Sequence, residues 1–349
     1  MPITEDSSVQ IKISPSEVLI QQDRGSQYVH FDFALRNTSK RGLKLRRIEV
    51  SVYDSGDRIL CVRRVDGNGT TRTSIATTGV TELAPEGPAA TVFNPFYEFS
   101  RDLPVARMDY RFDFCDEEAR SYSGSITVRP VVFLPRTVLR LPVRGSHLVD
   151  DGNDFYSHHR RLDLNDPLIC DGLGIRGNFS RYAYDFVAVD DAGKPFRGTG
   201  EEKEDWFGYG EAVFAPADGK VVVAVRSHPE ARDPILQALE RHDASLLAGN
   251  HVIIDHENGE FSLLGHLLGE TVSVKPGDRV RAGQVIGKLG LSGSTGHPHL
   301  HYELRTGTDF RTAEGLPSYF SEFDRILGDS RTRVRTGTFN TGDFIIRAD

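Results

Sequence analysis

The chain has 349 residues, 38% of them hydrophobic and 26% charged, which is the composition of a globular protein long enough for two domains. Its formal net charge of -8, without a dense Lys/Arg run, argues against nucleic acid and anionic membranes as partners. Its three widely spaced cysteines make neither a CxxC metal site nor a disulfide framework.

The amino terminus has neither the basic segment nor the apolar segment of a signal peptide. No stretch approaches the roughly 20 apolar residues of a membrane span, so we expect no such span. Two explanations remain open for any export: a signal has been removed from the sequence, or the route needs no signal.

Residues 1–135 are predicted to form an accessory β domain. Short runs in which apolar and polar residues alternate, such as 30–35, 43–53 and 108–114, are typical of antiparallel strands. An immunoglobulin-like β-sandwich fits these runs best. We find no catalytic constellation in them, so a targeting, docking or occluding role and a plain spacer role both remain open.

Residues 136–349 have a different character. Ten of the twelve histidines fall between His158 and His301. The apolar patterns and turn residues predict a β-rich, turn-dense domain, so β structure is expected to dominate the whole chain. The expected elements are strands at 220–225, 251–255 and 284–289, a hairpin at 272–280 and a short helix within 229–242.

The segment 297–304, His-Pro-His-Leu-His-Tyr-Glu-Leu, sets three imidazoles at alternating positions. In a β-strand these three side chains share one face, while Leu300 and Tyr302 point to the opposite, buried face. Neutral imidazole is the commonest protein ligand of zinc. The pattern therefore predicts a metal site, against the alternative of a strand that merely happens to contain histidines.

A series of motifs follows in order between residues 145 and 325. Together they make this part of the chain resemble the lysostaphin/LytM-like zinc metalloendopeptidases, which cut peptidoglycan cross-links. The motifs are Tyr184-Asp185-Phe186, Ala215-Pro216-Ala217-Asp218-Gly219, Gly249-Asn250-His251, Leu264-Gly265-His266-Leu267, Val274-Lys275-Pro276-Gly277-Asp278 and Pro298-His299-Leu300-His301-Tyr302-Glu303.

The resemblance implies roles for four residues. In that family Zn2+ is held by the histidine and aspartate of an H-x-x-x-D motif and by the second histidine of H-x-H, which here implies Asp185 and His301. Two further histidines assist catalysis, and these correspond to His266 and His299. Three protein ligands leave a fourth tetrahedral position for water, whose pKa zinc lowers to about 7.

One position departs from the family pattern. Four residues before Asp185, where the family has its first zinc histidine, this chain has Arg181, and a guanidinium has no lone pair to give a metal. The segment Ser157-His158-His159-Arg160-Arg161 resembles a divergent His-Arg-Arg branch of the family. By that resemblance we predict His159 as the third ligand, with His158 as the alternative. Weak or absent zinc binding remains open, with Arg181 stabilising an oxyanion or pairing with an acidic neighbour.

Three other histidines were weighed against the metal hypothesis. His256-Glu257 superficially begins an H-E-x-x-H motif, but Asn258-Gly259 is a hairpin turn signal that no zinc helix can contain. His297 is expected at the rim of a cleft. His251 has a cleft role or a structural role.

The expected function is therefore that of a zinc-dependent endopeptidase that hydrolyses peptide cross-links of bacterial peptidoglycan. The alternative is a catalytically impaired relative that binds cell wall or regulates other wall hydrolases, and an endopeptidase that acts on a protein is a third reading. Peptidoglycan peptides are the expected partners, with a wall hydrolase or secretion partner on the amino-terminal domain. A wall hydrolase acts outside the cytoplasm, in the periplasm or after secretion.

Overall fold

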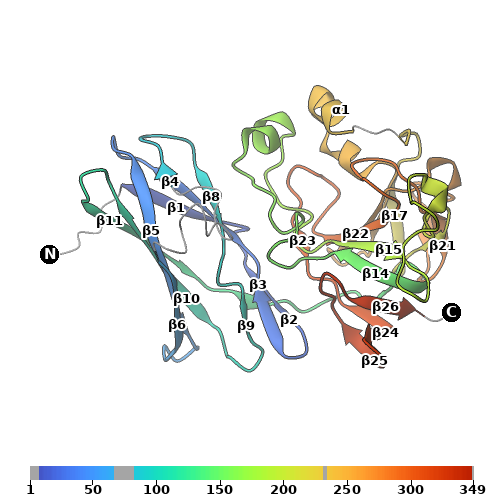
Figure 1. The fold of residues 1–349 in the computed structure, drawn as a ribbon, viewed down its shortest axis with the longest axis horizontal. Coiled ribbons are helices and arrows are strands. Elements are labelled where there is room, and N and C mark those ends of the chain that lie inside the picture. The colour runs from blue at the N-terminus through green and yellow to red at the C-terminus, as the bar shows by residue number, and fades with distance from the viewer. Residues whose placement is uncertain (1–7, 67–81, 231–233, 348–349) are drawn as a thin grey trace. The chain divides into compact units, whose positions relative to one another are not determined.

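The computed structural model describes residues 8–66, 82–230 and 234–347 (Figure 1). These residues fall into two compact units. The first runs to Phe133 and includes Asp163–Asp166, and the second comprises Leu134–Leu162 and Pro167 onward. The predicted halves, 1–135 and 136–349, differ from these units chiefly in the short segment 163–166.

The first unit is built from short strands around one apolar core. Three sheets have the orders β1-β4-β8, β11-β10-β5-β6 with β7 on β5, and β12-β2-β3-β9. The strands are β1 (Val9–Ser14), β2 (Leu19–Gln22), β3 (Ser26–Val29), β4 (Asp32–Asn37), β5 (Leu43–Tyr53), β6 (Ile59–Val65), β7 (Glu82–Leu83), β8 (Ala90–Phe93), β9 (Glu98–Ser100), β10 (Arg107–Cys115), β11 (Ser121–Val128) and β12 (Val131–Val132).

Alternation along β5 shows why this unit folds as β structure. Leu43 and Leu45 are buried, the alternation then changes phase, and Ile48, Val50 and Val52 are buried. The phase change coincides with a register shift where β5 pairs with β10, because a bulge places one extra residue in a strand. The all-β prediction is confirmed here, while the immunoglobulin-like topology stays a prediction.

The second unit contains a large sheet and a small one. The large sheet has the order β13-β24-β26-β14-β15-β22-β19-β18-β17-β20, with β23 on β22 and β25 on β24, and β16 pairs with β21. The strands are β13 (Leu139–Arg140), β14 (Gly145–Asp151), β15 (Tyr184–Ala188), β16 (Ala212–Phe214), β17 (Gly219–Ala224), β18 (Val252–Asp255), β19 (Phe261–Gly265), β20 (Arg279–Val280), β21 (Val285–Lys288), β22 (Leu300–Arg305), β23 (Gly315–Leu316), β24 (Phe320–Leu327), β25 (Ser330–Gly337) and β26 (Phe344–Arg347).

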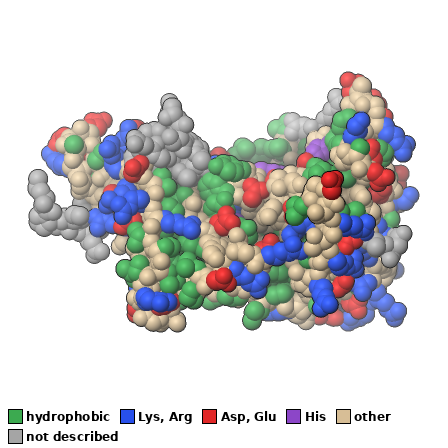
Figure 2. All heavy atoms as spheres, turned by 60° about the horizontal axis from the view of Figure 1, so that its bottom comes forward, with side chains coloured by type: hydrophobic (Ala, Val, Ile, Leu, Met, Phe, Trp, Pro, Cys, Tyr) green, Lys and Arg blue, Asp and Glu red, His purple; other side chains and the backbone are tan. Residues whose placement is uncertain are grey.

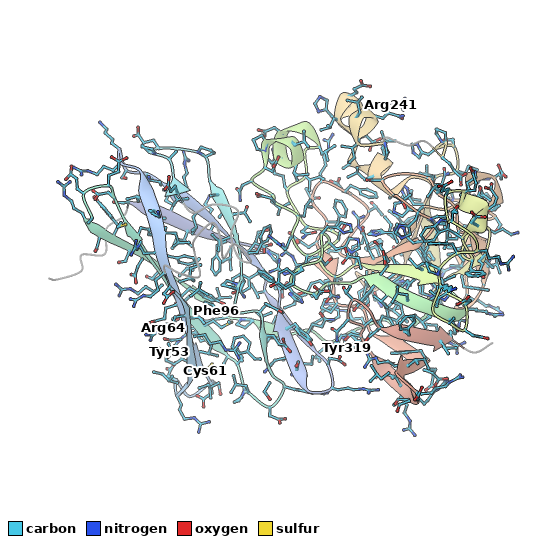
Figure 3. The ribbon with its side chains drawn as sticks, viewed as in Figure 1. Tyr53, Cys61, Arg64, Phe96, Arg241 and Tyr319 are labelled. Carbon is cyan, nitrogen blue, oxygen red and sulfur yellow. The ribbon has the colours of Figure 1, made fainter. Side chains whose placement is uncertain are left out.

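Short helical segments lie between these strands. They are the π-helix η2 (Leu168–Gly172), the 3-10 helices η3 (Lys203–Asp205), η4 (Ala244–Ala248) and η5 (Gly269–Thr271), and the α-helix α1 (Pro234–Arg241). Arg241, labelled in Figure 3, marks the end of α1. The helix predicted within 229–242 is confirmed by α1. Residues 231–233 of that range lie outside the described residues. Within the described part of the chain, no helix combines the length and apolarity needed to cross a membrane.

The three predicted strands of this unit are present, but the predicted hairpin at 272–280 is wrong. Residues 272–278 run as irregular chain, and β20 pairs instead with β17. Pro276 lacks the N–H that a ladder needs. The Asp278 carboxylate accepts a hydrogen bond from the Lys275 backbone N–H (3.0 Å), which closes a turn rather than continuing a strand.

Figure 2 shows the charged side chains of one face of the molecule. Lys and Arg side chains are interspersed with Asp and Glu, without one sign dominating that face. On the described part of this face, no patch of a single sign is visible.

Candidate active site

The centre of the second unit's sheet brings the predicted metal ligands together. Strand β22 lies between β15 and β19, with His301 opposite Asp185 on one side and Gly265 on the other. His266 follows Gly265 directly. Along β22, Leu300, Tyr302 and Leu304 enter the apolar core, so the intervening side chains share the opposite face.

Three imidazoles surround the Asp185 carboxylate. His301 Nδ1 lies 2.9 Å from Oδ1, His299 Nε2 lies 3.4 Å from Oδ1, and His159 Nε2 lies 3.4 Å from Oδ2. Burial opposes the charge of Asp185, but His299, His159 and the hydrogen bonds of the site hold its pKa well below the usual range. Asp185 is therefore an ionised, acceptor-only group at the centre of the site.

Outer hydrogen bonds fix which nitrogen of His159 and of His301 faces Asp185. His159 Nδ1 donates to the Gly152 carbonyl (3.2 Å), and His301 Nε2 donates to the Glu303 carboxylate (2.8 Å), because neither oxygen can donate. His159 Nε2 and His301 Nδ1 are left to face the carboxylate. This arrangement of a ligand's second nitrogen on a carbonyl or carboxylate is typical of metal-bound histidine.

The charges of these groups fit a cation. Burial lowers the pKa of His159 to about 4, so its Nε2 presents a lone pair toward Asp185 near neutral pH. Burial opposes protonation of His301, but hydrogen bonding to Asp185 and Glu303 raises the pKa of His301 to about 10. A proton therefore lies between His301 Nδ1 and the Asp185 carboxylate. A divalent metal in the place of that proton would face three donors, which are nitrogen and oxygen ligands of the kind that zinc accepts.

His158 and Arg181 are placed differently from His159. The His158 side chain is 74% exposed and pairs through Nδ1 with Asp151, whereas the His159 side chain is only 3% exposed. Ligand atoms of Asp151, His158, His159 and Asp185 nevertheless lie within 4.8 Å of one another. Arg181 is fully buried, and its Nε lies 3.8 Å from Glu314, so it has the acidic neighbour considered from the sequence.

His266 and His299 lie beside these donors. Their ring centroids are 4.7 Å apart, and the His266 ring is 5.6 Å from that of His301. His266 Nδ1 donates to the Ser292 carbonyl (2.7 Å) and His299 Nδ1 to the His297 carbonyl (3.0 Å), so His266 Nε2 remains available while His299 Nε2 faces Asp185. His266 reaches this place with a φ of 60°, a left-handed conformation uncommon for a residue with a Cβ and frequent at functional sites.

The two rings differ in proton affinity. Burial, with His299 and His301 nearby, holds the pKa of His266 well below its usual value. The pKa of His299 is raised: burial opposes its charge, but the Asp185 carboxylate outweighs burial. Two titratable groups whose surroundings push their pKa values apart can divide the tasks of base and acid.

A supporting network behind His301 was missed from the sequence. The Glu303 carboxylate, 1% exposed, accepts from His301 Nε2, from Ser180 Oγ (3.3 Å) and from Arg305 Nη1 (3.1 Å). Arg305 is also fully buried. The period of two that grouped the histidines continues through residues 303 and 305, so the same signal could have found both.

The remaining histidines lie at the rim or outside the site. His297 stacks on Trp206, with ring centroids 4.7 Å apart, and its Nε2 is 3.4 Å from Asp150. His251 is buried and donates to the Gly249 carbonyl (2.8 Å), a structural role. His256 lies in the connection between β18 and β19. Its ring nitrogens hydrogen-bond to the Asp218 carbonyl and to the Ser262 hydroxyl.

The site opens into a cleft of about 460 Å³. The five residues predicted as ligands or catalytic groups, His159, Asp185, His266, His299 and His301, all line it, and so does His297. Three further carboxylates, Asp150, Asp151 and Glu303, line it as well. Among the described residues of its lining there is no Lys or Arg, and Arg181 is not part of it.

Comparison with known proteins identifies a family. A model described as Peptidase family M23 matches residues 205–313. Peptidoglycan DD-endopeptidase ShyA of Vibrio cholerae is 39% identical over 98 residues, 27% of this chain and 17% of that protein. Murein hydrolase activator EnvC of Escherichia coli is 44% identical over 96 residues, 28% of this chain and 18% of that protein. The chain thus spans less than a fifth of the length of these relatives.

Among solved structures, the catalytic domain of lysostaphin from Staphylococcus simulans is 24% identical, with 38% of this chain and 74% of that chain covered and a TM-score of 0.26. The segment matched by the family model contains His266, His299 and His301, and it begins after His159 and Asp185. The resemblance to this peptidase family is confirmed: the chain carries a peptidase M23 domain over residues 205–313.

Proposed function

We propose that this protein is a zinc-dependent endopeptidase that hydrolyses peptide cross-links of bacterial peptidoglycan. The observation that carries the proposal is the convergence of His159 Nε2 and His301 Nδ1 on the ionised Asp185, each with its other nitrogen bonded to an acceptor. A metal that replaced the proton on His301 Nδ1 would find the His159 lone pair and the ionised Asp185 carboxylate facing it in a buried site, where a charge is stable only when it is paired.

His159, Asp185 and His301 are the residues that would hold the zinc. When bound, zinc supplies Lewis-acid polarisation of a peptide carbonyl and activation of water near neutral pH. Three protein donors leave room for substrate, as catalytic rather than structural zinc sites do.

The chain's own groups then handle the protons. His266, neutral because of its low pKa, accepts a proton from the attacking water at Nε2, since its Nδ1 is committed to the Ser292 carbonyl. His299, whose pKa is raised, holds a proton on Nε2 that it can donate to the oxyanion or to the leaving amine. Positioned acid–base groups of this kind contribute roughly 10²–10⁴-fold in rate.

The proposed substrate class comes from the relatives. ShyA is named for peptidoglycan endopeptidase activity, and the Neisseria meningitidis protein Mpg, 47% identical over 57 residues, 16% of this chain and 13% of that protein, is a DD-carboxypeptidase/endopeptidase. On this proposal the protein acts outside the cytoplasm. Its amino-terminal unit would serve to target it to the wall or to a partner there.

A second candidate is regulation rather than hydrolysis. EnvC is named as an activator of murein hydrolases, and this chain has Arg181 at the position where the family pattern has a zinc histidine. A catalytically impaired protein that binds cell wall would follow if His159 fails to act as a ligand.

Metal content distinguishes the two. We would measure zinc by elemental analysis in metal-replete protein, comparing wild type with His159→Ala, His301→Ala and His158→Ala. The expected result is near-stoichiometric zinc in wild type and in His158→Ala, and its loss in the other two, followed by release of peptides from purified peptidoglycan. Little zinc in folded wild type would overturn the hydrolytic function in favour of the regulatory one.

A further inference from the structure

The face of the sheet that carries His301 continues along β22 beyond Asp185. Same-face residues of a strand are about 6.6 Å apart. Glu303 therefore lies one step beyond His301, and Arg305 lies about 13 Å from His301. Glu303 lines the cleft, whereas Arg305 is buried behind the lining. Side chains that contact Arg305 and also line the cleft therefore mark a part of the cleft about 13 Å from the reacting centre.

The Arg305 end of this face is apolar. Phe179 and Phe310 meet edge to face, with ring centroids 5.2 Å apart. The buried Arg305 guanidinium lies against both rings, 4.4 Å from the Phe310 centroid and 5.1 Å from that of Phe179. The charge of Arg305 is met by Glu303, so it is not available to a ligand.

Further apolar side chains line the same cleft. Four segments distant in sequence contribute to the lining: the chain after the two adjacent histidines, the π-helix η2 with the loop that follows it, η4, and the loop after β22. The apolar residues in the lining are Leu162, Ile169, Ile175, Phe179, Leu247 and Phe310. Leu162, Ile169 and Leu247 are only partly buried, so they keep apolar surface that a ligand can cover.

We propose that the apolar part of the cleft, where Leu162, Ile169 and Leu247 keep exposed surface beside the buried Ile175, Phe179 and Phe310, is a subsite for an aliphatic side chain of the substrate peptide. The subsite is continuous with the donors around Asp185, because all of them line one cleft. It rests on the proposed function and deepens it: the enzyme selects peptides with an aliphatic side chain near the scissile bond over all-glycine cross-bridges.

The reach of an extended chain sets the distance. A peptide rises about 3.3 Å per residue, so about 13 Å corresponds to at most four residues from the scissile bond. A glycine bridge would leave the apolar surface in contact with water, whereas an aliphatic side chain removes that surface from water.

The test uses peptide series that differ at single positions. We would compare an octaglycine peptide with versions that carry leucine or alanine at each of the four positions on either side of the central bond, and measure kcat/KM for each. At one position leucine is expected to raise kcat/KM about tenfold or more over glycine, which is the size of discrimination apolar pockets reach. Equal kcat/KM for glycine and leucine at every position would overturn the subsite while leaving the proposed hydrolysis intact.

A matched pair of variants locates the preference. Leu247→Ser places a hydroxyl in the subsite and is expected to reduce the leucine-over-glycine ratio toward one. Leu236→Ser makes the same change on α1, at a side chain that is 56% exposed and outside the cleft lining, and is expected to keep the ratio. An unchanged ratio in Leu247→Ser would overturn the assignment.

Binding separates this inference from the function on which it rests. The leucine and octaglycine peptides would be titrated against zinc-replete wild type and Leu247→Ser by calorimetry. If no peptide is cleaved but wild type still binds the leucine peptide more tightly than octaglycine, and Leu247→Ser does not, the hydrolytic function fails and the subsite stands. Equal binding of both peptides by wild type would overturn the subsite.

Discussion

The two units of this protein bury different kinds of side chain. The first has an apolar core in which Tyr110 is packed among phenylalanines, and the Tyr110 hydroxyl donates to Asn94 (3.0 Å). The second has an apolar core on one face of β22 and buries ionisable groups on the other. Its fully buried side chains include Arg160, Arg181 and Arg305.

This difference indicates where the chemistry lies. Burying a charge is costly unless it is paired, and charged residues are almost never fully buried otherwise. In the first unit the described buried carboxylates are Asp32 and Asp116, and Asp116 receives hydrogen bonds from Arg41, Tyr122 and two backbone N–H groups. In the second unit, buried Asp185 faces imidazoles on which protons and a metal can exchange, which is the arrangement expected of a functional site.

The strongest test of this difference between the two units is to remove one buried carboxylate from each unit. Asp185→Ala is expected to abolish stoichiometric zinc binding, because it deletes the group on which three imidazoles converge. Asp116→Ala should lower the free energy of unfolding and leave zinc content unchanged. Elemental analysis and denaturant unfolding of both variants check this. Zinc retained in Asp185→Ala would place the metal elsewhere.

The second prediction concerns stability. Phe112 is fully buried in the first unit and meets Phe33 edge to face, with centroids 4.9 Å apart. Phe112→Ala is expected to lower the free energy of unfolding of that unit by about 3–5 kcal/mol, because it leaves a cavity. Zinc content of protein that remains folded should not change. If Phe112→Ala lost its zinc at the same low denaturant concentration at which its first unit unfolds, the two units would not unfold separately.

Sequence periodicity predicted the strand that carries His301, because side chains that alternate between a core and a polar face leave a period of two. The strand begins at Leu300, so His297 and His299 precede it rather than lying on it as predicted. The same pattern extends to Glu303 and Arg305. Neither was predicted as a site residue, because the His-x-His motif ends at His301 and does not indicate residues that act by orienting another side chain. The position of Asp185 opposite His301 followed from family order, not from periodicity, since strand pairing joins residues 116 apart.

Other features were beyond reach of the sequence. His158 and His159 are neighbours in the chain, and only the fold shows that one is exposed beside Asp151 while the other faces Asp185. The hairpin expected at 272–280 failed because Pro276 and the Asp278 side chain favour a turn. In that segment, local hydrogen bonding outweighed alternation.

The third prediction tests the network behind His301. Glu303→Gln keeps the shape of the side chain and removes its charge, so the zinc affinity is expected to fall about 10–100-fold, as it does when groups that orient metal ligands are changed. Glu260→Gln is the matched control. It changes a carboxylate that is equally buried, at 1% exposure, and accepts from the Arg136 backbone N–H (3.0 Å) away from the cleft. Competition against a zinc chelator measures both; equal affinities would remove Glu303 from the site's support.

The smallest expected effect concerns pH and a buried histidine outside the cleft. Burial lowers the pKa of His147, on β14, to about 4. Unfolding restores a pKa near 6.5, so the unfolded state binds more protons between pH 6.5 and pH 4. The stability from a neutral His147 is therefore present above pH 6.5 and falls by about 1.4 kcal/mol for each pH unit below it.

His147→Asn removes that titration. We expect the variant to be less stable than wild type at pH 7.5 because of imperfect packing, but to lose less free energy of unfolding between pH 6.5 and pH 5.5, by about 1 kcal/mol. Exposed His242 provides the control for the substitution itself, since His242→Asn makes the same change at a side chain that is not buried. Denaturant unfolding at the three pH values measures it. A slope in His147→Asn equal to that of wild type would assign the acid sensitivity to other buried histidines, such as His159 and His251, whose pKa values burial also lowers to about 4.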